Sequence, residues 1–269
     1  MQNGYYQVTG AMVTQFHKLD VTSNNLANVN TQGFKRDDIV IGDFERLYKN
    51  KRDILELKNH TKEAAKFFNR TINRVPKVVE NSIDFSMGSI RKTGNKLDFA
   101  LSKRDTFYAV MTPNGVRLTQ QSSFKLDNNG KIVTADGFAL LPKDFLSTNK
   151  KDITIKQKGD LNISDDGTIY IGKNRVDTIF VGAVKNLKAL KKEGDKFYTM
   201  PDLQNALNQV DGGGLMKQGY IQMSNINAVK EMTSLIETNR LVEMYQKVMT
   251  SHMDELNRDA ITKLATTRA

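Results

Sequence analysis

The chain has 269 residues, with 40 Lys and Arg against 30 Asp and Glu, which gives a net charge of +10 at pH 7. It contains no cysteine, which excludes disulfides, thiol nucleophiles and thiolate-bound metals, and its three histidines are the only imidazoles available for chemistry. The length allows one large domain or two ordinary ones with a substantial core.

The first thirty residues predict a helix with a narrow apolar stripe. Tyr5, Met12, Leu19 and Leu26 recur every seven residues, which is the 3.5-residue period of helix-on-helix packing. Gly33 follows the last apolar repeat and is expected to end the helix, because glycine past the final turn is a favoured helix stop.

The N-terminal segment does not resemble a cleaved secretory leader. Residues 1–16 carry no charged side chain, so the basic region of a signal peptide is lacking. No run of about 18 apolar residues occurs anywhere, so we expect no membrane-inserted segment.

The middle of the chain predicts β-structure. Between about Ile83 and Tyr198, short β-branched and aromatic runs alternate with turn residues. Asp127–Gly130 and Asp165–Gly167 each separate two such runs, so each predicts a β-hairpin. Leu97–Leu101 alternates with period two, which is typical of a half-buried strand.

The last fifty residues predict a second, longer helix. Large apolar residues again recur every seven positions: Leu235, Val242, Met249 and Leu256. Ser224 and Asn225 precede this run and are expected to cap the start of the helix.

This order predicts an α+β fold. We expect residues 1–34 and 216–269 to form a coiled-coil-like helical domain, residues 81–215 a β-rich middle domain, and residues 35–80 a linker or extension. A narrow stripe favours packing between helices over packing on a sheet. The two helices can pair with each other, with the β domain or with other copies of the chain.

No catalytic, cofactor or metal motif is found in the sequence. It has no HExxH pair, no nucleophile elbow and no phosphate loop, so we predict no catalytic residue, no cofactor and no metal. A hydrolase that uses His60 or His252 stays as an alternative. The basic residues are spread along the chain without an aromatic stacking signature, so no nucleic-acid binding is expected.

The segment from Leu19 to Lys35 is unusually rich in asparagine for a helix. One interpretation is a packed polar layer, in which Asn24, Asn25 and Asn28 bond to neighbouring helices and fix their register. The other is a frayed helix end followed by a turn.

The same segment closely resembles the N-terminal signature of the flagellar basal-body rod and hook protein family. The matching residues are Ser23–Asn28, Thr31, Gly33 and Phe34. The resemblance continues in four further blocks: Asp84–Gly88, Arg91–Leu101, Asn129–Gly137 and Gln218–Asn227.

The resemblance implies a structural subunit rather than an enzyme. Such a subunit polymerises helically through its terminal helices, together with copies of itself and related rod and hook subunits. It forms part of the hollow drive shaft that transmits torque from motor to hook, in the rod that spans the periplasm. Family members leave the cell through the flagellar type III export apparatus without a cleaved signal peptide.

The chain is far too short for the usual hook protein and is close in length to the proximal and distal rod subunits. Because Arg36–Val79 does not resemble the extension of the distal rod subunit, the resemblance favours the proximal rod subunit. The distal rod subunit is the first alternative. A non-flagellar coiled-coil adaptor, holding an acidic partner on its basic surface, is the second.

The helical stripes and the family signature together predict the residues of an assembly interface. These are Met12, Leu19, Ser23, Asn24, Asn25, Leu26, Asn28, Thr31, Gly33, Phe34, Ser224, Asn225, Leu235, Val242, Met249 and Leu256.

Overall fold

The structure is a computed structural model that describes residues 2–43, 76–145, 151–155, 159–201, 207–210 and 212–266. Residues 44–75, which contain His60 and most of the predicted 35–80 linker, lie outside the described residues. Two terminal helices and a β-rich middle confirm the α+β prediction.

The chain divides into two compact units. The helical unit comprises Met1–Ala27, Asp37–Ser82 and Asn227–Ala269, and the β unit comprises Asn28–Arg36 and Ile83–Ile226. This division groups residues 28–36 with the strands, whereas the sequence alone grouped residues 28–34 with the helices.

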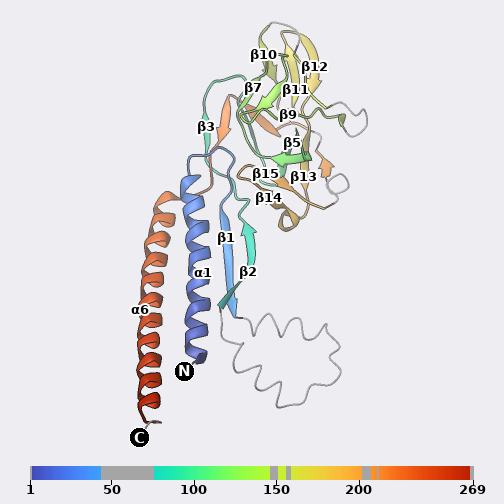
Figure 1. The fold of residues 1–269 in the computed structure, drawn as a ribbon. Helices are drawn as coiled ribbons and strands as arrows, with labels where there is room; N and C mark the ends of the chain where they lie inside the picture. Colours follow the sequence, from blue (N-terminus) through green and yellow to red (C-terminus); the bar gives the residue numbers. More distant parts are fainter. Residues whose placement is uncertain are drawn as a thin grey trace, which may run out of the picture. The chain divides into compact units, whose positions relative to one another are not determined.

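The helical unit pairs helix α1, Gln2–Ala27, with helix α6, Ala228–Thr266. The two helices run antiparallel, so that the start of α1 and the end of α6 are at the same end of the pair, where α6 extends beyond α1 (Figure 1). Strands β1, Asp37–Asp43, and β2, Pro76–Ile83, form a two-stranded ribbon, and β1 contacts α1.

Helix α1 ends at Ala27, six residues before the predicted stop at Gly33. Asn28 starts a turn instead, because its carbonyl accepts the amide of Thr31 at 3.0 Å and its Oδ1 accepts the hydroxyl of Thr31 at 3.0 Å. The asparagine side chain thus competes with helix continuation. Gly33, at φ +70°, belongs to the chain reversal after that turn.

Helix α6 is capped by Asn227, so the prediction that Ser224 and Asn225 provide the cap is wrong. The Oδ1 of Asn227 accepts the amides of Val229 at 3.1 Å and Lys230 at 3.2 Å. These amides lie in the first turn, where no helical carbonyl can reach them.

The β unit contains sixteen named strands and one short 3-10 helix among its described residues. The first eight strands are β3 Ile90–Lys92, β4 Phe99–Leu101, β5 Thr106–Thr112, β6 Gly115–Thr119, β7 Phe124–Leu126, β8 Ile132–Thr134, β9 Ala139–Leu140 and β10 Leu161–Ile163. The others are β11 Thr168–Ile171, β12 Asn174–Thr178, β13 Val181–Val184, β14 Lys191–Glu193, β15 Phe197–Thr199, β16 Leu207–Gln209, β17 Met216–Gln218 and β18 Tyr220–Gln222; the 3-10 helix η1 is Leu187–Ala189.

A nine-stranded sheet is the main layer of this unit. Its strands follow the order β14-β15-β6-β5-β9-β8-β7, and β13 joins β5 to β16. Strands β10, β11 and β12 form a separate small sheet, while β17 pairs with β4 and β18 pairs with β3.

Both predicted hairpins are confirmed. Strand β7 pairs antiparallel with β8 across Asp127–Gly130, and β10 pairs with β11 across Asp165–Gly167. Leu97–Leu101 differs from its prediction, because Asp98 and all three residues of β4 are buried rather than alternating. Strand β4 pairs edge to edge with β17, and its Phe99 and Leu101 belong to the larger core cluster.

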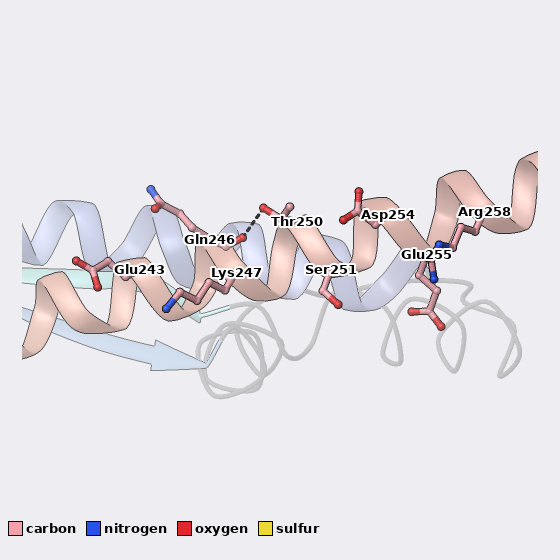
Figure 2. A pocket seen from close by; sticks show the side chains of 8 residues that line it. All are labelled: Glu243, Gln246, Lys247, Thr250, Ser251, Asp254, Glu255 and Arg258. Atoms are coloured by element: carbon pink, nitrogen blue, oxygen red, sulfur yellow. Dashed lines mark hydrogen bonds between the residues drawn. The ribbon is translucent and has the colours of Figure 1, made fainter.

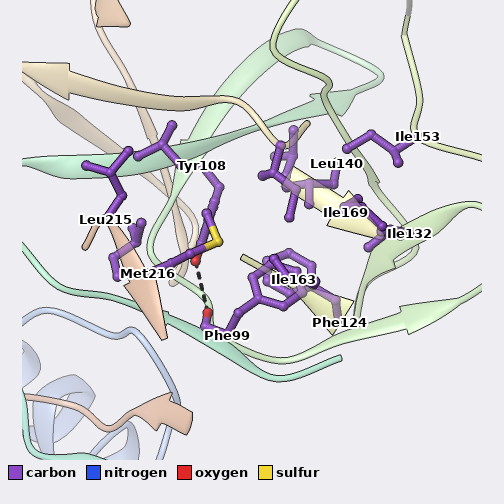
Figure 3. Packing of buried hydrophobic residues seen from close by; sticks show 14 residues of the cluster. Phe99, Tyr108, Phe124, Ile132, Leu140, Ile153, Ile163, Ile169, Leu215 and Met216 are labelled. Carbon is purple, nitrogen blue, oxygen red and sulfur yellow. Dashed lines mark hydrogen bonds between the residues drawn. The ribbon is translucent and has the colours of Figure 1, made fainter. Parts of the chain in front are cut away.

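The larger core cluster is built around an aromatic trio. The rings of Phe99 and Phe124 stack with centroids 4.4 Å apart, and Tyr108 meets both edge-on (Figure 3). The hydroxyl of Tyr108 donates to the carbonyl of Phe99 at 3.0 Å, which satisfies its one buried polar group. A second cluster around Phe107, Phe180 and Tyr198 adds to the core.

We expect Phe124→Ala to lower the free energy of unfolding of the β unit by about 3–5 kcal/mol, because a fully buried stacked ring would leave a cavity. Leu126→Ala is the matched control in the same strand, since that side chain is 45% exposed. Urea unfolding followed by near-ultraviolet circular dichroism measures both variants. Equal losses in the two variants would contradict the described core.

Candidate functional site: the assembly surface and its joint

One stripe of α6 is turned into the helical unit. Its buried and partly buried residues alternate at spacings of four and three: Glu231, Leu235, Thr238, Val242, Tyr245, Met249 and His252. Leu235, Val242 and Met249 hold the predicted heptad positions. The second inward-facing position of each heptad holds residues that hydropathy alone does not select, namely Glu231, Thr238, Tyr245 and His252. Leu256 lies farther along the same helix.

The buried residues of α1 are smaller and more polar than predicted. Ala11, Thr14, Thr22 and Asn25 are buried, whereas the predicted Met12, Leu19 and Leu26 are only partly buried. Small side chains allow a close approach of a neighbouring element.

The two buried threonines of α1 need no outside partner for their hydroxyls. Thr14 donates to the carbonyl of Gly10 at 2.8 Å, and Thr22 donates to that of Lys18 at 2.8 Å. Bonding within the helix satisfies both hydroxyls, so threonine is tolerated on the packed face.

Asn25 ties α1 to the start of β1. Its amide nitrogen donates to the carbonyl of Asp37 at 2.8 Å, and its amide oxygen accepts the backbone N–H of Asp37 at 2.9 Å. The side chain is only 1% exposed. In the single chain this asparagine therefore bonds to a strand, not to another helix as the polar-layer interpretation proposed.

The remaining faces of both helices carry exposed apolar side chains. Val13 and Phe16 of α1 are 48% and 40% exposed, and the predicted Ser23 and Asn24 are exposed on the same helix. Seven large apolar residues of α6 are exposed as well: Val229, Met232, Ile236, Met244, Val248, Met253 and Ile261.

The predicted residues that follow α1 belong to a hydrogen-bonded joint within the β unit. We define the joint as three segments: Gly33–Arg36, Asp84–Ser86 and Gln222–Asn225. The amide of Gly33 donates to the carbonyl of Gln222 at 3.0 Å, and the amide of Asp84 donates to the carbonyl of Arg36 at 2.9 Å. The segments Asp84–Ser86 and Gln222–Asn225 are thus each hydrogen-bonded to Gly33–Arg36.

Asn225 bonds to both other segments through its side chain. Its Oδ1 accepts the amide of Arg36 at 2.9 Å, while its Nδ2 donates to the carbonyl of Asp84 at 2.7 Å and to the hydroxyl of Ser86 at 2.9 Å. The adjacent Ser224 is buried, and its Oγ accepts the amide of Ile226 at 3.3 Å. Both predicted residues are therefore placed in the joint rather than in the helix.

Lys35 is the residue of the joint that sequence reasoning missed. Its side chain is fully buried, and its ammonium donates to the carbonyl of Ser86 at 2.9 Å. Burial lowers the pKa of Lys35 to about 8, and the negative charge of Asp84 partly opposes that shift. Nothing in the local sequence distinguishes this lysine from the exposed ones.

Phe34, the last residue of the family signature, anchors the joint. It is fully buried, and the ammonium of Lys192 lies 3.6 Å from the centroid of its ring. The same ammonium donates to the carbonyl of Lys35 at 3.2 Å. The cation therefore contacts both the aromatic face and the backbone beside it.

Models of three families match separate parts of the chain. "Flagella basal body rod protein" matches residues 7–35, "Flagellar hook protein FlgE/F/G D1 domain" matches residues 104–171, and "Flagellar basal body rod FlgEFG protein C-terminal" matches residues 217–262. The chain belongs to the flagellar basal-body rod protein family. The matched segments include most of α1, the middle of the β unit and most of α6.

Relatives of this family match nearly the whole chain. The flagellar basal-body rod protein FlgF of Caulobacter vibrioides is 28% identical over 267 residues, which is 98% of each chain. The rod protein FlgG of Agrobacterium fabrum is 29% identical over 250 residues, 89% of this chain and 91% of the relative. The FlgG of Buchnera aphidicola subsp. Schizaphis graminum is 29% identical over 240 residues, 85% and 87% respectively.

The family is one of structural proteins, and this chain is not an enzyme. His17 is exposed on α1, and the partly buried His252 lies 3.9 Å from the carboxylate of Glu255, one helical turn away. No group of three potential metal ligands occurs among the described residues. Within the same residues, no helix has the length and apolar content needed to cross a membrane.

Gly33→Ala tests the close approach in the joint. A Cβ at Gly33 would lie 2.5 Å from the carbonyl oxygen of Gln120, in addition to the strain of φ +70°. We expect a loss of about 2–4 kcal/mol in the stability of the β unit. Gly172→Ala is the matched control, because Gly172 has φ +61° with no atom within 4 Å, and it should cost about 1 kcal/mol. Similar thermal melts for the two variants would refute the close approach.

Asn225→Asp tests the bridging role of the amide. A carboxylate keeps the bond to the amide of Arg36 but faces the carbonyl of Asp84 without a donor, so we expect a loss of about 1–3 kcal/mol. Asn227→Asp should be nearly neutral, because an N-cap needs only an acceptor. Chemical unfolding of both variants distinguishes these roles, and a neutral Asn225→Asp would eliminate the bridge.

Proposed function

We propose that this chain is a structural subunit of the bacterial flagellar rod that polymerises helically through its terminal helices. The apolar side chains left exposed on α1 and α6 are the observation that carries this proposal. Of fourteen exposed large hydrophobic residues among the described residues, nine lie on these two helices. A surface of this kind is characteristic of a protein–protein contact.

The lengths of the two helices support the same conclusion. Helix α1 has 26 residues and α6 has 39, so at 1.5 Å per residue α6 is longer by about 20 Å. Helix α1 therefore cannot cover the whole of α6. Met253 and Ile261, in the last part of α6, are 51% and 68% exposed.

The outward face of α6 changes character along its length. Val229, Met232 and Ile236 share one side at spacings of three and four, and Glu243 and Thr250 continue that side at intervals of seven. Farther along, the side chains around a hollow on this face are all polar or charged: Glu243, Gln246, Lys247, Thr250, Ser251, Asp254, Glu255 and Arg258 (Figure 2). We infer that the apolar start of this face and Met253 meet neighbouring subunits, and that the polar side chains around the hollow face water, as in the wall of a hollow tube.

The helical pair is proposed to act as a coiled-coil-like assembly domain. Its buried stripe of alternating four- and three-residue spacing supports this packing. Contacts between copies would be head-to-tail, since a heterologous contact whose rotation does not close produces a helical filament. Related rod and hook subunits are the proposed axial neighbours.

We place the subunit in the proximal rod, spanning the periplasm, after export by the flagellar type III apparatus. The distal rod subunit is the alternative, because relatives named FlgF and FlgG both match over most of the chain. Locating the tagged chain along the axis of purified basal bodies by electron microscopy distinguishes the two positions.

Replacing Val229 and Ile236 together by serine tests the assembly surface. Both side chains are more than half exposed, so the melting of the dilute monomer should change little. Recovery of the chain in purified basal bodies, and swimming, should fall strongly when this double variant replaces the wild-type chain. Leu126→Ser is the control, because it removes an exposed apolar residue from the β unit. Normal incorporation of the double variant would refute the proposed surface.

A further inference from the structure

Lys35 is a buried cation without an ion-pair partner among the described residues. Its ammonium bonds to the neutral carbonyl of Ser86 at 2.9 Å. With the Gln222 amide turned so that its oxygen faces the lysine, that oxygen accepts from the ammonium at 3.1 Å. Neither acceptor carries the negative charge that normally compensates a buried cation.

The charged groups around Lys35 do not neutralise it. Asp84, between β2 and β3, attracts the ammonium without contacting it, and Arg36 is the next residue of the same segment. Lys192, from β14, brings a further positive charge to the backbone carbonyl of Lys35. A methionine of similar length would fill this space without the desolvation of a charge, so the lysine weakens the joint when it is protonated.

We propose that Lys35 makes the joint a charge-controlled latch, in which protonation of the buried amine loosens Asn28–Arg36 from the rest of the β unit and loss of the proton tightens it. Opening would break the bonds from Gly33 to Gln222 and from Arg36 to Asn225 while the aromatic core stays folded. This inference goes beyond rod assembly, because it concerns the isolated chain.

The direction of the pH dependence follows from linkage. The ordinary lysine pKa of 10.5 applies when the joint is open and the side chain is in water, whereas the pKa falls to about 8 when the joint is closed. Between these values the open form holds a proton that the closed form has lost. The closed joint therefore gains stability as the pH rises through this range, and the penalty is fully present below about pH 8.

Amide hydrogen exchange on the dilute full-length chain tests the latch. The protection factors of the Gly33 and Arg36 amides should rise on the order of tenfold or more between about pH 7.5 and 9.5. The amide of Ile132, which bonds to the carbonyl of Ile153 in the core, is the internal control and should not follow this rise. An equal rise at Ile132 would overturn the proposal, as would flat protection in the joint.

Two further measurements assign the effect to this side chain. Lys35→Met should remove the pH dependence and raise protection at neutral pH, whereas Lys192→Met should keep the pH dependence. Direct NMR titration of the Lys35 amine in the wild-type chain should give a midpoint near 8, and it needs no variant to fold. A midpoint above 10, or an unchanged pH slope in Lys35→Met, would refute the latch. The proposal of rod assembly does not depend on the latch, so neither of these results tests it.

Discussion

Two antiparallel helices of unequal length can cover only one face of each other, and this constraint leaves apolar side chains exposed on both helices. The buried stripe of α6 runs from Glu231 to His252, and Met253 and Ile261 beyond it are 51% and 68% exposed. The β unit has no such deficit, because two aromatic-rich clusters fill its interior. Among the described residues, the helical unit therefore leaves more large apolar side chains exposed than the β unit does.

The joint holds together the three points at which the chain leaves or re-enters the β unit. The polypeptide leaves the β unit after Arg36, returns at Ile83 and leaves again after Ile226. The side chain of Asn225 bonds to the backbone of Arg36 and Asp84, so one amide group links the β-unit ends of all three passages. Gly33 allows the first segment to approach Gln120 more closely than any side chain would permit.

The sequence predicted the elements well, because periodicity and turn residues are local signals. Both long helices and both hairpins follow from spacing, whereas Gly33, which the spacing predicts as the helix stop, lies six residues beyond the end of α1. The role of Asn225 could not be predicted in this way, since the same amide can cap a helix or bridge distant segments, and only the fold brings Arg36 and Asp84 to it. Lys35 was missed for the same reason: its burial depends on Ser86 and Gln222, which are far away in the sequence.

The packed face of α1 explains why hydropathy alone misjudged which of its residues are buried. Ala11, Thr14, Thr22 and Asn25 are buried because they are small or find their own hydrogen bonds, while the larger Val13 and Phe16 remain exposed. A monomer selected only for its own stability would bury the larger apolar groups and leave the polar ones in water. The inverse arrangement is favourable when a second protein surface covers Val13 and Phe16. The pattern of burial on α1 thus supports assembly independently of the exposed face of α6.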